Sequence, residues 1–379
     1  MEKSFYNVAV LGGGCSGFQL LHQLSKQPDW SQKNVALFND SAPLKRSWCF
    51  WTKDEHPLQH LVQKSWSKLS FKGRDFSKTE DIAPYQYHYI SGEAFFDYFQ
   101  NDFLSDNKNI TPINHTVTSI QKKGEGFYIQ NNVAHWEAEK VFSSLPPKLE
   151  KGGPSVFSLK QHFKGWFIKT EEPVFDDSTV MLMDFSIPQY DDTRFVYVLP
   201  FSKTEALVEM TVFSPYIYED DVYDAILHDY MNQHFPNARF KIENTEKGAI
   251  PMTNAPFSRL GNEGEVLLGT AAGMVKATTG YAFKRIGRDS ERLAEDLTTQ
   301  KELRWSATKG RFRFYDRLLL GILSEEPLLG SVIFETLFRR VDMKTIMRFL
   351  DEETSLWEEI SIFSKLPYVP FLKQVYRQL

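Results

Sequence analysis

Cysteine is scarce in this chain: Cys15 and Cys49 are the only two among 379 residues. Two cysteines are too few for the disulfide framework that many small secreted domains need. The N-terminus lacks the pattern of a signal peptide, because an apolar run typical of a strand begins almost at residue 1. We therefore expect a protein of the reducing cytoplasm.

Positive charge is not in excess, and long apolar runs are missing. The chain has 44 basic and 49 acidic residues and a formal net charge of -5 at pH 7, whereas a nucleic-acid-binding protein usually has a basic face. No apolar run reaches the roughly eighteen residues that a membrane-spanning helix needs. These absences argue against nucleic acid as a partner and against a transmembrane helix, and no set of metal ligands is predicted.

Aromatic residues, in contrast, are abundant, with 31 Phe, 16 Tyr and 8 Trp. Hydrophobic residues make up 42% of the chain, enough at this length for one large or two medium domains. Phe95, Phe96, Phe99 and Phe103 recur at helical spacing, which predicts a buried helix face. Residues 46–51, Arg-Ser-Trp-Cys-Phe-Trp, could form a hydrophobic plug or the wall of a pocket, and the sequence favours the plug.

The most informative stretch lies near the start of the chain. Residues 6–11 form an apolar run typical of a buried parallel strand, and residues 18–24 have apolar side chains at helical spacing. Between them, residues 12–17 match G-x-G-x-x-G, and a second apolar strand is predicted at 34–38. This order of strand, glycine turn, helix and strand is typical of a dinucleotide-binding fold.

Each glycine of this turn has a separate predicted purpose. Gly12 would permit the tight turn, Gly14 the approach of a pyrophosphate to the backbone, and Gly17 the packing of the helix on the strand. The fingerprint also expects an acidic residue after the second strand, which binds a ribose hydroxyl. Either Asp40 makes this contact one residue later than expected, or Asn39 makes a neutral one.

The middle of the chain has β-type patterns. Three short runs predict a meander at 116–120, 126–130 and 134–141. Prolines and glycines between 146 and 154 then break the pattern, and we expect a domain boundary there. Further strands are predicted at 180–185, 194–199 and 206–213.

The strand at 206–213 carries a carboxyl group among apolar residues. Leu207, Glu209, Thr211 and Phe213 share one face of this strand. Glu209 either reaches solvent at a sheet edge, which is the more common case, or is buried with a raised pKa. The sequence alone leaves both alternatives open.

A second strand–turn–helix pattern appears late in the chain. It has a strand at 266–268, a turn of small residues at 269–273, and a helix that ends near Leu297 after Thr278-Thr279-Gly280-Tyr281. Small residues allow the close approach of a flat or phosphorylated group. A late segment that rejoins an N-terminal nucleotide fold is typical of flavoproteins with a split cofactor domain.

These patterns predict an α/β protein in three parts. Residues 1–150 and 255–300 would form a split Rossmann-type domain that binds FAD, and residues 151–254 an inserted antiparallel β-sheet domain for the substrate. Residues 301–379 would be mainly helical.

The last nineteen residues contain no acidic side chain. Tyr368, Leu372, Val375 and Leu379 fall at helical spacing, so this segment could lie in a membrane interface. A terminal helix docked on the protein is an equally good interpretation.

The chain resembles the lycopene cyclases, in particular the bacterial lycopene beta-cyclases, within the wider geranylgeranyl-reductase-like flavoproteins. The resemblance covers most of the chain. It is carried by the glycine turn at 12–17, residues 46–51, Met183-Asp184-Phe185, Gln189, Arg194-Phe195-Val196-Tyr197-Val198-Leu199-Pro200 and residues 273–281.

The resemblance implies a redox-neutral, acid-catalysed closure of the ends of lycopene to beta-ionone rings. Leu207-Val208-Glu209-Met210-Thr211 falls where the family has its catalytic glutamate, so Glu209 inherits that role, and Asp184 is a candidate second carboxylate. Reduced FAD would stabilise a carbocation, with NAD(P)H as the reductant, and the enzyme would be peripheral on the inner face of the cell membrane. The residues implied to contact FAD are Gly12, Gly14, Gly17, Asn39, Asp40, Arg46, Gly269, Gly273, Thr279 and Gly280, and those implied to line the substrate site are Trp48, Phe50, Trp51 and Tyr281.

The chain departs from relatives at several positions. Lys276 and Ala277 stand where many relatives have His-Pro, and Thr270 stands where related flavoproteins often have an aspartate. Residues 349–354 imitate the catalytic glutamate motif, but we expect them to form a solvated helical face. Two other functions are considered: a flavin oxidoreductase acting on a prenyl lipid, and a carotenoid-binding protein without enzymatic activity.

Overall fold

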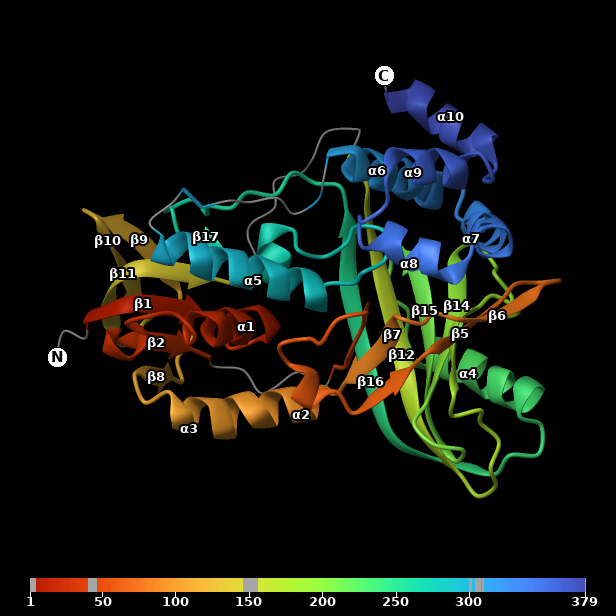
Figure 1. Ribbon diagram of the computed structural model, residues 1–379, viewed down its shortest axis with the longest axis horizontal. Helices are drawn as coiled ribbons and strands as arrows, with labels where there is room; N and C mark the ends of the chain where they lie inside the picture. Colours follow the sequence, from red (N-terminus) through yellow and green to blue (C-terminus); the bar gives the residue numbers. More distant parts are fainter. Residues whose placement is uncertain are drawn as a thin grey trace.

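The computed structural model describes residues 5–39, 46–145, 156–299, 302–303, 308 and 310–378. A nucleotide-type layer lies at the end of the molecule near the N-terminus, and a large sheet covered by helices lies at the other end (Figure 1). The predicted domain boundary at 146–154 and the candidate ribose ligand Asp40 lie outside the described residues.

The nucleotide-type layer starts as the sequence predicts. β1 (Phe5–Leu11), α1 (Cys15–Leu24) and β2 (Val35–Phe38) follow one another, and β1 and β2 are parallel neighbours. The strand order is β8-β2-β1-β11-β10-β9, with β17 also paired to β11. The further strands are β8 (Ile110–Ile113), β9 (Ser119–Lys123), β10 (Gly126–Gln130), β11 (His135–Ser143) and β17 (Val266–Leu267).

Two distant segments complete this layer together. β9, β10 and β11 form the predicted antiparallel meander. β17 pairs in parallel with β11, and α5 (Phe283–Thr298) packs beside α1 (Figure 1). The late strand–turn–helix segment therefore rejoins the N-terminal fold, as the sequence predicts.

The large sheet has the strand order β16-β12-β15-β14-β13-β5-β6. Neighbours are antiparallel except for β13 and β5. Its strands are β5 (Lys68–Lys72), β6 (Ser77–Asp81), β12 (Ser158–Thr170), β13 (Thr179–Asp184), β14 (Thr193–Pro200), β15 (Glu205–Ser214) and β16 (Phe240–Thr253). The sheet of the middle segment thus also takes in residues 68–81. A small third sheet consists of β3 (Trp48–Thr52), β4 (Lys64–Trp66) and β7 (Gln86–Ile90).

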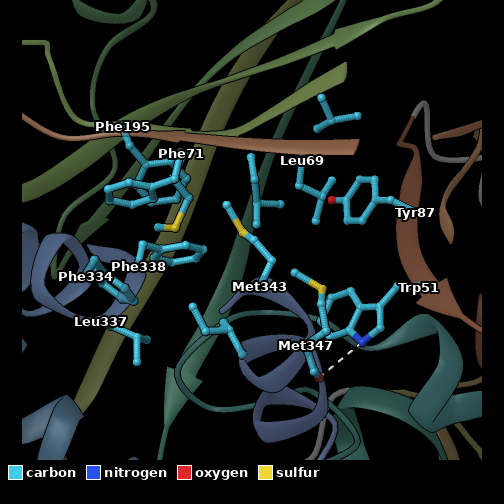
Figure 2. Packing of buried hydrophobic residues seen from close by; sticks show 14 of the residues in the cluster. Trp51, Leu69, Phe71, Tyr87, Phe195, Phe334, Leu337, Phe338, Met343 and Met347 are labelled. Atoms are coloured by element: carbon cyan, nitrogen blue, oxygen red, sulfur yellow. Dashed lines mark hydrogen bonds between the residues drawn. The ribbon is translucent and has the colours of Figure 1, made fainter. Parts of the chain in front are cut away.

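The two faces of the large sheet are covered by different helices. α4 (Asp220–His234) packs on the face that presents Val208, Met210 and Val212. Leu207 and Phe213 point to the opposite face, so the predicted alternation along β15 is confirmed. Figure 2 shows the core on that second face, where Phe71 from β5 stacks on Phe338 with ring centroids 4.3 Å apart.

Helices supply the rest of this second core and of the C-terminal region. α2 (Gly92–Asp97), η3 (Tyr98–Phe103) and α3 (Leu104–Asp106) are continuous and bury the predicted phenylalanine stripe. The C-terminal helices are α6 (Gly310–Glu325), α7 (Leu328–Arg340), α8 (Met343–Leu350), α9 (Leu356–Phe363) and α10 (Tyr368–Gln378). The short helical turns are η1 (Trp30–Gln32), η2 (Gln59–Leu61) and η4 (Gly269–Ala272). No helix among the described residues has the length and apolar character needed to cross a bilayer.

The expectation of a solvated helical face at 349–354 is wrong. α8 ends at Leu350, and Glu352 and Thr354 after it are buried. Glu352 is buried because Lys276 Nζ donates to its carboxylate at 3.1 Å and Arg285 at 2.9 Å. A buried carboxylate is tolerated there because cations from the late cofactor segment compensate its charge.

Candidate active site

A cavity of about 390 Å³ lies between the nucleotide-type layer and the large sheet. Its wall includes the glycine turn, the loop before β3, strands β12, β14, β15 and β16, and residues 279–286. Of the predicted site residues, the cavity brings together Gly14, Arg46, Trp48, Glu209, Thr279, Gly280 and Tyr281.

At each of the three motif positions of the turn, glycine suits the structure for a different physical reason. At Gly12, φ is +105°, and a Cβ would lie 2.1 Å from Ser144 Oγ. A Cβ on Gly17 would lie 2.1 Å from the carbonyl oxygen of Gly12, so the close packing of helix on turn requires glycine. A Cβ on Gly14 would meet nothing within 4 Å, although Gly14 lines the cavity. The space at Gly14 fits a ligand that approaches the backbone closely.

Two buried oxygen atoms at this cavity also point to a bound ligand. Thr279 Oγ1 and Gln161 Oε1 have no hydrogen-bond partner within the part of the chain that the structure describes. Both residues line the cavity. Buried polar groups usually find a partner, so these atoms fit a polar cofactor in the space between them and the glycine turn.

The remaining predicted cofactor residues shape the turns around the cavity. Asn39 lies against the glycine turn, since a Cβ on Gly13 would be 3.0 Å from the Cβ of Asn39. Gly269 has φ +56° and packs against Ser16 at the start of α1. Gly273 has φ +73° and ends η4.

Buried ion pairs anchor the loop that carries Thr279 and Tyr281. Lys276 Nζ donates to Asp316 at 2.8 Å as well as to Glu352. The backbone N–H of Lys276 donates to the carbonyl oxygen of Tyr281 at 3.0 Å. Lys276 thus ties the cavity loop to the C-terminal region.

Glu209 faces this cavity beside a second carboxyl group, Glu246. In the sheet register Gly165 of β12 is the partner of Glu209 on β15 and of Glu246 on β16. Partners in adjacent strands point to the same face, so the two glutamates project to one side of the sheet. Their carboxyl groups are hydrogen bonded to each other.

The environment of this pair favours one shared proton. Burial and the nearby charge of Glu246 raise the pKa of Glu209 well above its ordinary value. Burial also raises the pKa of Glu246, although hydrogen bonds from Ser47 oppose this effect. Two carboxyl groups in contact cannot both ionise easily. The proton therefore resides on Glu209, whose O–H donates to the carboxylate of Glu246.

Aromatic rings surround the protonated carboxyl. Tyr197 stands directly opposite Glu209 on β14. The Tyr281 hydroxyl forms a hydrogen bond of 3.0 Å with the Tyr87 hydroxyl. Trp48 also lines the cavity and lies against Phe283, with ring centroids 5.7 Å apart. The cavity thus combines a proton donor with π faces that can attract a cation.

The predicted second carboxylate and two of the predicted substrate-lining residues do not line this cavity. Asp184 lies on the α4 side of the sheet, where Tyr230 donates to it at 3.0 Å, because its register partner Val196 faces α4. Phe50 is buried and stacks on Phe283. Trp51 is buried in the second core and donates to the carbonyl oxygen of Met347 at 3.2 Å (Figure 2). Residues 46–49 therefore line the cavity, whereas Phe50 and Trp51 form the predicted hydrophobic plug.

Sequence reasoning missed Glu246. It lies in the polar run Asn244-Thr245-Glu246-Lys247, which has the character of an exposed strand end. Only the register across Gly165 and the contact with Ser47 bring it into the site. The buried carboxyl is therefore a product of long-range pairing rather than of a local pattern.

Comparison with solved structures shows that the chain shares its fold with known flavoproteins. The chain is similar to a flavoprotein/dehydrogenase from Cytophaga hutchinsonii, with 14% identity, a TM-score of 0.63 and coverage of 99% of this chain and 100% of that one. It is also similar to a geranylgeranyl bacteriochlorophyll reductase-like protein from Thermoplasma acidophilum, with 12% identity, a TM-score of 0.58 and coverage of 100% of both chains.

Within that class, the chain belongs to the lycopene cyclase protein family, whose model matches residues 7–375. The chain is 34% identical over 129 residues to a lycopene beta-cyclase from Paracoccus sp. (strain N81106 / MBIC 01143). This match spans 32% of the chain and 32% of that relative.

Proposed function

We propose that the protein closes the linear ends of lycopene to beta-ionone rings, forming gamma-carotene and beta-carotene without net redox change. The observation that carries this proposal is the carboxyl of Glu209, whose pKa is raised by burial, at a cavity walled largely by aromatic and apolar side chains. A hydrocarbon offers no heteroatom for recognition, so shape and apolar contact must hold it. Membership of the family and the Paracoccus relative support the choice of substrate.

The reaction balances with the carboxyl pair alone. Glu209 gives its proton to the terminal double bond of lycopene, and a tertiary carbocation forms. Ring closure moves the positive charge into the ring, and the carboxyl pair takes up a ring proton as the new double bond forms. The tyrosine rings and Trp48 face the cation. One proton leaves the pair and one returns, so no electrons are exchanged.

The site fits FAD as the resident cofactor. The glycine turn would receive the pyrophosphate at Gly14, and Thr279 and Gln161 offer hydrogen bonds deeper in the cavity. When bound in its reduced, anionic form, FAD would supply negative charge near the carbocation. NAD(P)H would serve only to reduce the flavin before the first turnover.

A product assay separates this function from oxidoreduction and from simple binding. Purified protein with FAD, a reductant and lycopene in detergent is expected to yield beta rings with no oxidation of nicotinamide per ring. Consumption of one nicotinamide per molecule of product would identify an oxidoreductase. Recovery of bound, unchanged lycopene would identify a carotenoid-binding protein. Either result would overturn the proposed function.

We further propose that the protein draws its substrate from the cytoplasmic face of the cell membrane. α9 and α10 are consecutive helices at one end of the molecule (Figure 1). α10 is docked on α6 by polar contacts, including one from Gln374 to Glu325, so the docked interpretation of the last segment is confirmed. Several of its apolar side chains are nevertheless exposed. The exposed side chains of this C-terminal patch are Leu356, Trp357, Ile360, Tyr368, Val369, Leu372 and Tyr376.

Replacing Trp357, Leu372 and Tyr376 together by serine is expected to lower recovery with floated vesicles of phosphatidylcholine and phosphatidylglycerol several-fold. The reason is that these exposed side chains would supply most of the apolar area buried in the interface. The matched control replaces Tyr190, Tyr216 and Ile217, which are also exposed, by serine. Equal recovery of the two triple variants would remove the C-terminal patch from the account.

A further inference from the structure

A second, larger cavity of about 850 Å³ adjoins the active-site cavity. Its wall is rich in polar side chains, among them Lys64, Glu93 and Glu243. The two cavities share four lining residues, which are Arg46, Ser47, Phe96 and Glu246. Glu209 lines the inner cavity, whereas Glu246 lines both. Of the two carboxyl groups, only that of Glu246 therefore borders the outer cavity.

The sheet is built so that the two carboxyl groups can meet. β12 runs between β15 and β16, and adjacent strands are about 4.8 Å apart. Glu209 and Glu246 must therefore reach each other across the position of Gly165. A Cβ on Gly165 would lie 3.2 Å from the Cβ of Glu209 and 2.7 Å from Leu207 Cδ1. The absent side chain leaves the space that the carboxyl contact needs.

Burial raises the pKa of Glu246, but fixed donors around its carboxyl favour the charged form. Ser47 donates to Glu246 from its backbone N–H at 3.1 Å, and from its hydroxyl at 2.8 Å to Oε2 and 2.9 Å to Oε1. Arg46 adds a favourable positive charge that lowers the pKa of Glu246. Hydrogen bonds to the charged form of an acid favour that form. Ser47 and Arg46 thus keep the proton on the inner carboxyl.

The other titratable side chains around the pair are neutral near pH 7. They come from β3, β7, β14 and the loop before α5, and they are Cys49, Tyr87, Tyr89, Tyr197 and Tyr281. Burial raises the pKa of each of these groups. The charge that acts on Glu209 therefore comes mainly from Glu246.

We propose that Glu246 is the positioning residue of the catalytic acid: it accepts the hydrogen bond of protonated Glu209 and exchanges the proton of the pair with the outer cavity. This inference rests on the proposed function, because it assigns a role in the same reaction. A ring proton taken up by the pair can leave through Glu246, and a solvent proton can enter by the same route. Proton exchange is thereby separated from the space that holds the hydrocarbon and its cation.

The first test compares Glu246→Gln with Glu243→Gln. Glu243 makes a matched control because it is an exposed glutamate on the same strand and lines the outer cavity. Removing the negative neighbour makes Glu209 easier to ionise. The alkaline limb of kcat/KM is therefore expected to move to lower pH by roughly one unit or more in Glu246→Gln, and to stay in place in Glu243→Gln.

The same variants are compared for deuterium in products formed in D₂O. Without the exchange route, a proton taken from one ring stays on Glu209 and enters the next substrate. Rings made by Glu246→Gln are therefore expected to contain clearly less than one deuteron each, whereas those made by Glu243→Gln contain one. A merely structural loss would lower the rate but leave the deuterium content unchanged. An unshifted pH limb with one deuteron per ring in Glu246→Gln would overturn the proposal.

Infrared titration of the substrate-free protein separates this proposal from the proposed function. The carbonyl stretch of a protonated carboxyl is expected near neutral pH in the wild type, absent in Glu209→Gln, and shifted to lower pH in Glu246→Gln. If Glu246→Gln fails to fold, Ser47→Ala takes its place in this experiment. Without the Ser47 hydroxyl, the charged form of Glu246 loses a donor, so the proton shifts toward Glu246 and the carbonyl band changes. Identical titrations in all of these proteins would refute the pairing, whether or not the wild type forms rings.

Discussion

Replacing Glu209 by glutamine will lower the rate of ring formation by about 10²- to 10⁴-fold, the usual contribution of a positioned general acid. Glutamine keeps the shape of the side chain and can still accept the hydrogen bond that Thr211 donates to Oε1 at 3.1 Å. It cannot supply a proton to an alkene. Flavin binding should persist, because the variant loses an acid and not its fold. The measurement is product formed per minute by flavin-loaded protein.

The control for this result is Glu205→Gln. Glu205 lies on the same strand and forms a surface ion pair with Lys169, so its loss should leave activity unchanged.

Thermal unfolding provides a second check. The raised pKa of Glu209 in the folded state means that stability is lost as pH rises from the ordinary carboxyl range toward that pKa. Glu209→Gln should therefore be at least as stable as the wild type at neutral pH. Near-normal activity would refute the assignment and leave Glu246 as the next carboxyl at the cavity.

Replacing Gly14 by leucine will weaken FAD binding by more than about 100-fold without unfolding the protein. A Cβ at this position meets no protein atom within 4 Å, so leucine would project into the space where the pyrophosphate approaches the backbone. The measurement is flavin absorbance that stays with the protein through gel filtration, together with thermal unfolding of the apoprotein.

Substitutions at two other glycines serve as comparisons for the loss of FAD binding in Gly14→Leu. Gly310 also has open space where a Cβ would be, but it lies at the start of α6 away from the active-site cavity, so Gly310→Leu should retain flavin. Gly17→Ala should destabilise the apoprotein as well, because its Cβ would clash with the carbonyl oxygen of Gly12. Full retention of flavin by Gly14→Leu would contradict the placement of the pyrophosphate.

The elements of the nucleotide-type layer could be predicted because their signals are local. Apolar periodicity located β1, α1 and β2, and glycines marked the turn between them. The same signals located β17 and α5 in the late segment. The structure confirms that β17 joins β11. The pairing of β5 with β13, which adds the β5–β6 hairpin to the large sheet, was not predicted, because partner choice between strands far apart in sequence leaves no local pattern.

The candidate site could be predicted only in part. Glu209 was visible as a carboxyl in an apolar strand, but its solvated or buried state depended on neighbours from other strands. The structure settles the alternatives, since Glu209 lies at a cavity with a raised pKa. Glu246 could not be inferred, because its burial depends on Gly165 and Ser47, which are distant in the sequence. Asp184 was conspicuous in its motif, yet the pleat turns it to the α4 side.

The most direct test of the central claim is the deuterium content of rings formed by the wild-type protein in D₂O, measured together with nicotinamide consumption. If Glu209 is a solvent-exchanged acid in a redox-neutral reaction, mass spectrometry will find one deuteron in each new ring while the nicotinamide pool stays constant. Rings without deuterium, or oxidation of one nicotinamide for each ring, would contradict the account.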